Sequence, residues 1–342
     1  MNKQPTKKIE YLAAAGYNEG IPMSVLLVCL PADRLTEAQR AQIYAAAPSM
    51  RVVMTTERAV IEEMLDDIEI AVGSFPHDLL PRARNLRWLQ EWGAGVDWLL
   101  RHPEVAKLEF TLTNASGVHA IPISEQILGY LLAFARRLPA AVRAQDRRAW
   151  QAPKRDQLFE LAGKTMLLVG VGAIGARTAV IAAALGMRVL GIRRNPTGKL
   201  PGVQAIYGSD QLLELLPEAD CVVLTVPLSQ ATQGMIGARE LRAMKPTSYL
   251  INIGRGGTIQ QPALIQALRE GWIAGAGLDV FEQEPLPATS PLWGLENVIM
   301  TAHYAGLTPA YDQRALAIFL DNLRRYHARE PLENVVDKVA GY

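Results

Sequence analysis

Four polar side chains in the second half of the chain could bind a small acid and exchange a proton with it. Arg255 lies in the stretch Asn-Ile-Gly-Arg-Gly-Gly, and its planar guanidinium can bind a carboxylate with two hydrogen bonds. Asp279 and Glu284 lie in an acidic segment, and His303 follows a short apolar run. An imidazole exchanges protons near neutral pH, and a neighbouring carboxylate favours its charged form. Loop histidines are more often structural than catalytic, and acidic loops are more often simply solvated. These four residues therefore indicate a catalytic site only in combination with the motif that precedes them.

That preceding motif is rich in glycine. Gly170-Val-Gly-Ala-Ile-Gly175 follows the apolar run 165–169 and opens an apolar helical pattern. In dinucleotide-binding proteins the three glycines allow a tight turn, a close approach to the pyrophosphate and close helix–strand packing, and the helix N-terminus offers N–H groups to the phosphates. A turn used only for packing, or a site for another nucleotide-like ligand such as a methyltransferase cofactor, are the alternatives. The predicted phosphate-binding residues are Gly170, Gly172, Ala173, Ile174 and Gly175.

The residues after the next apolar run indicate which dinucleotide binds. NAD-dependent proteins usually carry Asp or Glu about 20 residues after the glycine motif, where it accepts a hydrogen bond from the ribose. Here Arg193 and Arg194 occupy that region, with Lys199 nearby. A guanidinium can bind a 2′-phosphate that a carboxylate would repel. The sequence therefore predicts NADP, with NAD as the second option; the alternative is an exposed basic loop without a ligand.

Apolar runs of strand length alternate with helical patterns along the chain, which favours parallel sheets covered by helices. We expect an α/β protein with two Rossmann-like or flavodoxin-like domains and a cleft between them. Residues 1–118 and 310–342 would form the substrate-binding (catalytic) domain, and residues 119–309 the dinucleotide-binding domain. The expected strands are 24–30, 51–54, 68–72, 85–91, 108–113, 165–169, 188–192, 221–226, 249–252, 274–280 and 298–300, and the expected helices are 36–47, 56–66, 123–138, 173–185 and 310–327.

The composition argues against several classes of protein. The chain has 342 residues, enough for two domains with large cores. Its formal net charge of +1 gives no reason to expect nucleic-acid binding, and its apolar runs are too short to span a membrane. Cys29 and Cys221 suit a reducing compartment and offer no metal-ligand spacing, and residues 1–20 do not resemble a secretory signal. We therefore expect a cytoplasmic protein without a bound metal.

From residue 88 to residue 336 the sequence resembles the D-isomer-specific 2-hydroxyacid dehydrogenases, with glyoxylate and hydroxypyruvate reductases among them. The resemblance implies that Arg255, Glu284 and His303 are the catalytic residues. Arg193 replaces the acidic residue that is usual in the family, and Ala302 stands where many members have proline. The motifs that carry the resemblance are Gly93-Ala-Gly-Val-Asp97, Leu161-Ala-Gly-Lys-Thr165, the glycine motif, Val226-Pro227, the Arg255 stretch, the segment from Asp279 to Pro285, and His303-Tyr-Ala-Gly306.

The resemblance also implies binding roles outside this trio. Backbone amides near Gly95 would hold the substrate carboxylate, and Asp279 would lie near the nicotinamide carboxamide. Family members are typically dimers in which the region 123–138 lies near the partner, so we expect a homodimer. The implied substrate-binding residues are Ala94, Gly95, Val96, Arg255 and His303, and the further cofactor-binding residues are Thr225, Val226, Pro227, Ile253 and Asp279.

These side chains fit the reduction of a small 2-oxo acid, such as glyoxylate or hydroxypyruvate, to the D-2-hydroxy acid with NADPH. Arg255 would bind the carboxylate and polarise the ketone, and His303, oriented by Glu284, would act as general acid and base. Alternatives on the same fold are dehydrogenases of phosphoglycerate, phosphite or formate. A further alternative is a non-catalytic dinucleotide-sensing protein, similar to corepressors built on this fold.

Several histidines and aromatic residues remain outside this scheme. Ser74, Phe75 and His77 follow a predicted strand of the first domain and could contact the substrate, although a plain turn is an equal alternative. His119 has no obvious partner in the sequence, and we expect it not to be catalytic. Trp150 could pack in a core or line a cleft, and a core position is the expectation.

Overall fold

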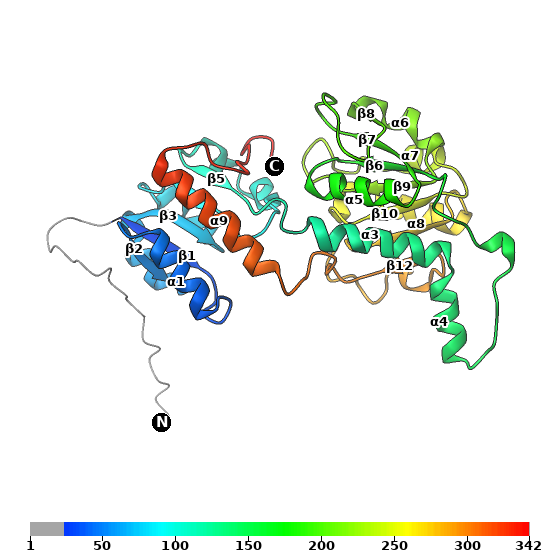
Figure 1. Ribbon diagram of the computed structural model, residues 1–342, viewed down its shortest axis with the longest axis horizontal. Coiled ribbons are helices and arrows are strands. Elements are labelled where there is room, and N and C mark those ends of the chain that lie inside the picture. The colour runs from blue at the N-terminus through cyan, green and yellow to red at the C-terminus, as the bar shows by residue number, and fades with distance from the viewer. Residues whose placement is uncertain (1–23, 342) are drawn as a thin grey trace. The chain divides into compact units, whose positions relative to one another are not determined.

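The computed structural model describes residues 24–341, which form two compact units (Figure 1). Unit 1 consists of the chain up to Val118 together with Pro309–Tyr342, and unit 2 is His119–Thr308. The stretch 1–20, in which the sequence predicts no secretory signal, lies outside the described residues. No helix within residues 24–341 is long and apolar enough to cross a bilayer.

Unit 1 is built on a parallel sheet with the strand order β2-β1-β3-β4-β5. This is the flavodoxin-like order, and one apolar core lies on each face of the sheet. Helix α9 covers one face, where Phe319 stacks on Trp88 and Asn322 donates to Gln90 over 3.1 Å. The strands are β1 (Val25–Cys29), β2 (Arg51–Met54), β3 (Ile68–Gly73), β4 (Trp88–Gln90) and β5 (Thr111–Thr113), and the α-helices are α1 (Glu37–Ala46), α2 (Arg58–Glu63) and α9 (Tyr311–Ala328).

Unit 2 is built on a larger parallel sheet with the order β12-β11-β10-β9-β6-β7-β8. The order reverses at β6, between β7 and β9, which is where open α/β sheets bind ligands. The strands are β6 (Thr165–Val169), β7 (Arg188–Ile192), β8 (Ala205–Tyr207), β9 (Cys221–Leu224), β10 (Tyr249–Asn252), β11 (Gly275–Leu278) and β12 (Val298–Met300). The α-helices are α3 (Ala120–Ala135), α4 (Leu138–Asp146), α5 (Ala173–Ala184), α6 (Leu212–Leu215), α7 (Ala238–Ala243) and α8 (Gln261–Glu270).

The predicted fold class is confirmed, and the differences from the expected elements are local. The helix expected over 123–138 divides at Arg137, which adopts a left-handed conformation with φ 55° and starts the separate helix α4. Strand β8 was not predicted, because three half-buried residues at a sheet edge carry almost no alternating pattern. The strands expected over 85–91 and 274–280 are shorter in the structure, where they span Trp88–Gln90 and Gly275–Leu278.

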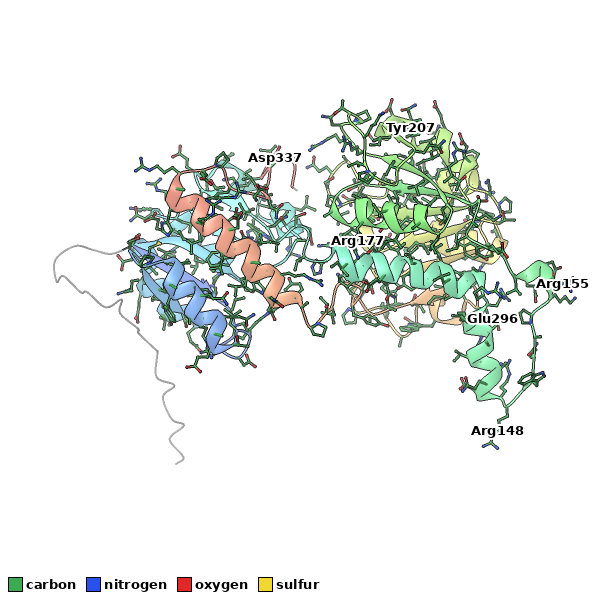
Figure 2. All side chains as sticks on the ribbon, in the orientation of Figure 1. Arg148, Arg155, Arg177, Tyr207, Glu296 and Asp337 are labelled. Carbon is green, nitrogen blue, oxygen red and sulfur yellow. The ribbon has the colours of Figure 1, made fainter. Side chains whose placement is uncertain are left out.

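Trp150, expected in a core, is fully exposed at 105 %. It lies in the segment that follows α4, and α4 with this segment extends away from the rest of unit 2 (Figure 1). We call α4 and the segment that follows it the α4 arm. Figure 2 shows Arg148 at the outer end of this arm and Arg155 on the segment that leads back toward the sheet of unit 2. The expectation for Trp150 was wrong because it relied on residue type, whereas the charged residues around it favour a solvated segment.

Candidate active site

The glycine motif lies at the carboxyl end of β6, where its packing requires glycine at two positions. Gly170 has φ 100°, and a Cβ there would lie 2.9 Å from Thr225 Oγ1 and from Val226 Cγ1. A Cβ on Gly175 would lie 2.3 Å from the Gly170 carbonyl oxygen. Thr225 donates a hydrogen bond to that same carbonyl oxygen over 2.6 Å. These contacts hold the loop after β6 against the loop after β9.

Open space lies beside Gly172, the second glycine of the motif. Gly172 is the N-cap of α5, and a Cβ there would meet no atom within 4 Å. The first N–H groups of an α-helix have no partner inside the helix, and together with the helix dipole they favour an anion. The loop between β6 and α5 can therefore hold the pyrophosphate of a dinucleotide.

Arg193 and Arg194 follow β7 and lie on the next loop of this sheet edge. The backbone N–H of Arg193 donates to Tyr207 on β8 over 3.1 Å, which fixes the start of the loop. The Arg193 Nε atom is buried and has no hydrogen-bond partner among the described residues, whereas Arg194 is exposed. A buried guanidinium N–H without a partner is costly, and a bound phosphate would satisfy it. The chain has no Asp or Glu between Arg188 and Gly208 that could compete for it.

Arg255 begins the tight turn after β10, and the glycines beside it allow its backbone to approach two other loops. A Cβ on Gly254 would lie 2.6 Å from the Val226 carbonyl oxygen, and one on Gly256 would lie 1.9 Å from the Phe281 carbonyl carbon. The Arg255 guanidinium donates to the Gly254 carbonyl over 2.9 Å. The turn thus places one cation beside the loops that follow β9 and β11.

Glu284 and His303 form a short side-chain contact in unit 2. Glu284 Oε2 lies 2.6 Å from His303 Nδ1, and Glu284 Oε1 accepts the Phe281 N–H over 2.9 Å. The pairing assigns the Nδ1 proton to the bond with Glu284 and leaves Nε2 as the nitrogen that can serve a substrate. His303 itself adopts a left-handed conformation with φ 54°. The sequence predicted that these two side chains would meet, and the structure places them in contact.

Asp279 lies inside unit 2 and is 2 % exposed. Its carboxylate accepts hydrogen bonds from the Thr301 hydroxyl and from the Tyr304 and Ala305 N–H groups, at 2.5, 3.1 and 3.1 Å. Its backbone carbonyl accepts the His303 N–H over 2.9 Å. The carboxylate is therefore used by the chain itself, and contact with the nicotinamide carboxamide stays a prediction.

Sequence reasoning missed His119 as a neighbour of the trio. Its Nδ1 lies 3.2 Å from the Gly306 carbonyl oxygen, 187 residues away, and a Cβ on Gly306 would lie 2.6 Å from that nitrogen. Burial lowers the pKa of His119, and the charges of Arg255 and His303 lower it further. The ring therefore favours its neutral form beside the catalytic candidates. No signal in the sequence pairs positions so far apart.

The remaining candidates, Ala94, Gly95 and Val96, lie in unit 1 after β4. Asn114 donates to the Ala94 carbonyl over 2.9 Å and Val96 is buried, while Gly95 is exposed. This loop is thus anchored at both sides of an accessible glycine.

His77, also in unit 1, has partners that the sequence did not indicate. Its ring stacks on Trp98 with the ring centres 3.7 Å apart, and its Nε2 lies 3.4 Å from Glu91 Oε1. Neither residue is adjacent to His77 in the sequence, so only the fold could reveal the stack. Among residues 24–341 no group of three or more His, Cys, Asp or Glu side chains is arranged to hold a metal ion.

Comparison with known proteins identifies the family. Residues 128–305 match the family model described as D-isomer specific 2-hydroxyacid dehydrogenase, NAD binding domain. The chain is 35% identical over 302 residues to a glyoxylate reductase of Korarchaeum cryptofilum, an alignment that covers 86% of this chain and 87% of the relative.

Two solved structures of similar proteins contain NADPH or NADP. One is a D-isomer specific 2-hydroxyacid dehydrogenase from Xanthobacter autotrophicus in complex with NADPH, with 31% identity, a TM-score of 0.80 and coverage of 94% of this chain and 100% of that chain. The other is an NADPH-dependent glyoxylate/hydroxypyruvate reductase from Sinorhizobium meliloti in complex with NADP, with 30% identity, a TM-score of 0.79 and coverage of 93% and 100%. The chain therefore belongs to the D-isomer-specific 2-hydroxyacid dehydrogenase family and is an NAD(P)-dependent oxidoreductase.

Proposed function

We propose that this protein reduces a small 2-oxo acid of the glyoxylate or hydroxypyruvate type to the D-2-hydroxy acid with NADPH, and that His303 is the proton donor. The observation that carries the proposal is the 2.6 Å contact between His303 Nδ1 and Glu284 in the same unit as Arg255. Glu284 orients the His303 ring as a proton donor, and the Arg255 guanidinium can bind the carboxylate of the substrate. The glyoxylate reductase relative and the glyoxylate/hydroxypyruvate reductase structure support this substrate class.

The residues of unit 2 fit the binding of NADPH. The first turn of α5 would hold the pyrophosphate, and Arg193 with Arg194 would hold the 2′-phosphate. The loop of Thr225, Val226 and Pro227, together with Ile253 and Asp279, would flank the rest of the dinucleotide. When bound, NADPH supplies the hydride for the carbonyl carbon.

The side chains of the trio then have separate tasks. Arg255 binds the substrate carboxylate and stabilises negative charge that develops on the ketone oxygen. His303 donates a proton to that oxygen, and Glu284 keeps the ring oriented while it does so.

A direct assay tests this proposal. Purified protein is mixed with NADPH or NADH and with glyoxylate, hydroxypyruvate, pyruvate or 3-phosphohydroxypyruvate, and the absorbance of the reduced nicotinamide is followed. We expect rapid loss of absorbance with NADPH and with glyoxylate or hydroxypyruvate. Turnover confined to 3-phosphohydroxypyruvate would overturn the substrate class, and binding of NADPH without turnover of any acid would overturn the proposed reaction.

Replacing Arg193 by alanine is expected to weaken NADPH selectively. Loss of a charge-assisted hydrogen-bond partner of the 2′-phosphate costs about 1.5–3 kcal/mol, which raises the KM for NADPH about 10-fold to 100-fold. The KM for NADH should stay within about twofold, because NADH lacks that phosphate. Arg269→Ala, at an exposed position on α8, is the control. An equal rise of both KM values in Arg193→Ala would contradict a 2′-phosphate site.

We propose a second copy of this chain as the partner of the α4 arm, residues 136–155. Three large apolar side chains on it are exposed, namely Leu138, Val142 and Trp150, at 50, 56 and 105 %. Exposed apolar groups gathered on one protruding segment are typical of an association surface. The family resemblance, which places the region 123–138 near a partner, supports a homodimer.

The arm can be tested by charge insertion. The native protein is expected to sediment at twice the 37.4 kDa mass of the chain, and Val142→Glu combined with Trp150→Glu at the mass of one chain. A carboxylate in an apolar interface is expensive to desolvate. Val339→Glu, which adds a charge at an apolar position of unit 1 exposed by 86 %, serves as control and should leave the mass unchanged. A double variant that keeps the dimer mass would refute the role of the arm.

A further inference from the structure

A tyrosine on α3 packs against the sheet of unit 2 near the end of β11. Tyr130 is 2 % exposed, and α3 packs against β10 and β11. The ring fits because β11 has glycine beside it: a Cβ on Gly277 would lie 2.8 Å from Tyr130 Cγ. The position of the Tyr130 ring therefore depends on both α3 and β11.

The Tyr130 hydroxyl is the first member of a directed chain of hydrogen bonds. It contacts the Thr301 hydroxyl, and Thr301 Oγ1 donates in turn to Asp279 Oδ1 over 2.5 Å. A threonine hydroxyl has a single proton, and here it is used toward Asp279, so the phenol donates to Thr301. The Tyr130 hydroxyl also donates to the Leu278 carbonyl over 3.2 Å, so its proton is shared between the two acceptors. Burial raises the pKa of Tyr130 to about 12, which keeps the phenol protonated and able to donate.

The chain of hydrogen bonds ends on the backbone that carries the proton donor. The Asp279 carboxylate accepts the N–H groups of Tyr304 and Ala305, and its carbonyl accepts the N–H of His303. Three consecutive amides thus bind one buried residue. His303 holds its left-handed φ of 54° inside this cradle, a conformation that costs energy for a residue other than glycine and that neighbouring contacts must maintain.

We propose that Tyr130 is a positioning residue for the reduction. Through Thr301 and Asp279 it holds the backbone of residues 303–305, and thereby the orientation of the His303 ring toward the substrate. Tyr130 touches neither substrate nor cofactor in this scheme, so its removal should affect the proton-transfer geometry and leave binding intact. The effect on turnover rests on the proposed function.

The kinetic test uses variants that remove one hydroxyl each. Tyr130→Phe and Thr301→Val keep the shape of the side chain and should each lower kcat about tenfold, because small misplacements of a reacting group are costly, while KM for the oxo acid stays within about twofold. Thr301→Ser keeps the hydroxyl and should retain at least about half of the native kcat. Tyr249→Phe, on β10 of the same unit, is the matched control and should keep the native kcat. A kcat in Tyr130→Phe above about half of the native value, or an equal loss in Tyr249→Phe, would overturn the inference.

A measurement without substrate separates this inference from the proposed reaction. Amide hydrogen exchange of residues 302–306 reports on the backbone that Asp279 holds. We expect exchange about tenfold faster in Tyr130→Phe than in the native protein or in Tyr249→Phe. Unchanged exchange would overturn the positioning role even if the native enzyme is active. Faster exchange in a protein that reduces no 2-oxo acid would support the positioning role and reject only the proposed function.

Discussion

His303→Ala is expected to lower kcat for the 2-oxo acid by about 10²–10⁴, the usual contribution of a positioned general acid. The reason lies in the pairing with Glu284 at 2.6 Å, which orients the ring. Alanine leaves the developing oxyanion without its proton donor. The dissociation constant of NADPH, measured by fluorescence titration, should stay within about twofold, because the glycine motif and Arg193 lie on other loops.

The control for this variant is His327→Ala, at an exposed position on α9 in unit 1, which should keep the native kcat. Thermal unfolding of both variants shows whether the fold is retained. Native turnover in His303→Ala would remove His303 from the mechanism. A parallel loss of NADPH affinity would mean that the substitution disturbs the cofactor site rather than proton transfer.

Arg255→Lys is expected to lower kcat/KM for the oxo acid by about 10²–10³, although the positive charge is kept. A lysine presents a single ammonium and cannot reproduce the two parallel hydrogen bonds of a guanidinium to a carboxylate. Removing one partner of such a charge pair typically costs about 2–5 kcal/mol. The expected 10²–10³-fold loss of kcat/KM in Arg255→Lys corresponds to about 3–4 kcal/mol and lies within that range. Initial rates over a range of oxo-acid concentrations at saturating NADPH provide the measurement.

Arg269→Lys tests the same chemical change at an exposed position of unit 2 and should leave kcat/KM unchanged. An Arg255→Lys enzyme with native kcat/KM would show that the guanidinium fork is not used. If both KM for NADPH and KM for the oxo acid rise equally, Arg255 acts on the cofactor, and the assignment to the substrate carboxylate is wrong.

Local patterns in the sequence were sufficient wherever the structure depends on neighbours along the chain. The glycine motif was recognisable because the strand β6, the turn and the helix α5 follow one another within about 20 residues, and each glycine has its own local reason. The apolar run that became β1 was equally clear, since all five of its residues, Val25–Cys29, are buried. The fold class followed from the alternation of such runs with helical patterns.

Patterns failed where apolar periodicity or residue type was used alone. Nothing in the helical periodicity of 123–138 indicated that Arg137 would turn left-handed and divide the helix. Residue type alone suggested a core position for Trp150, whereas its segment lies in solvent. Pro139 near the start of α4 marks a local interruption of the helix, and the charged residues around Trp150 favour solvent, so both outcomes depend on neighbouring residues rather than on apolar periodicity or residue type alone.

The sequence by itself determined the order and the types of the chemical groups in this protein: a glycine motif, then two arginines, then an arginine, a glutamate and a histidine at the ends of successive strands. Only the tertiary structure decided which groups touch. Tyr130 contacts Thr301, 171 residues away, and His119 contacts Gly306, 187 residues away. The second contact requires glycine at position 306, because a Cβ there would clash with the His119 ring. The physical reason is that parallel strands place distant segments at one edge of a sheet, so proximity there depends on strand order and packing and not on spacing along the chain.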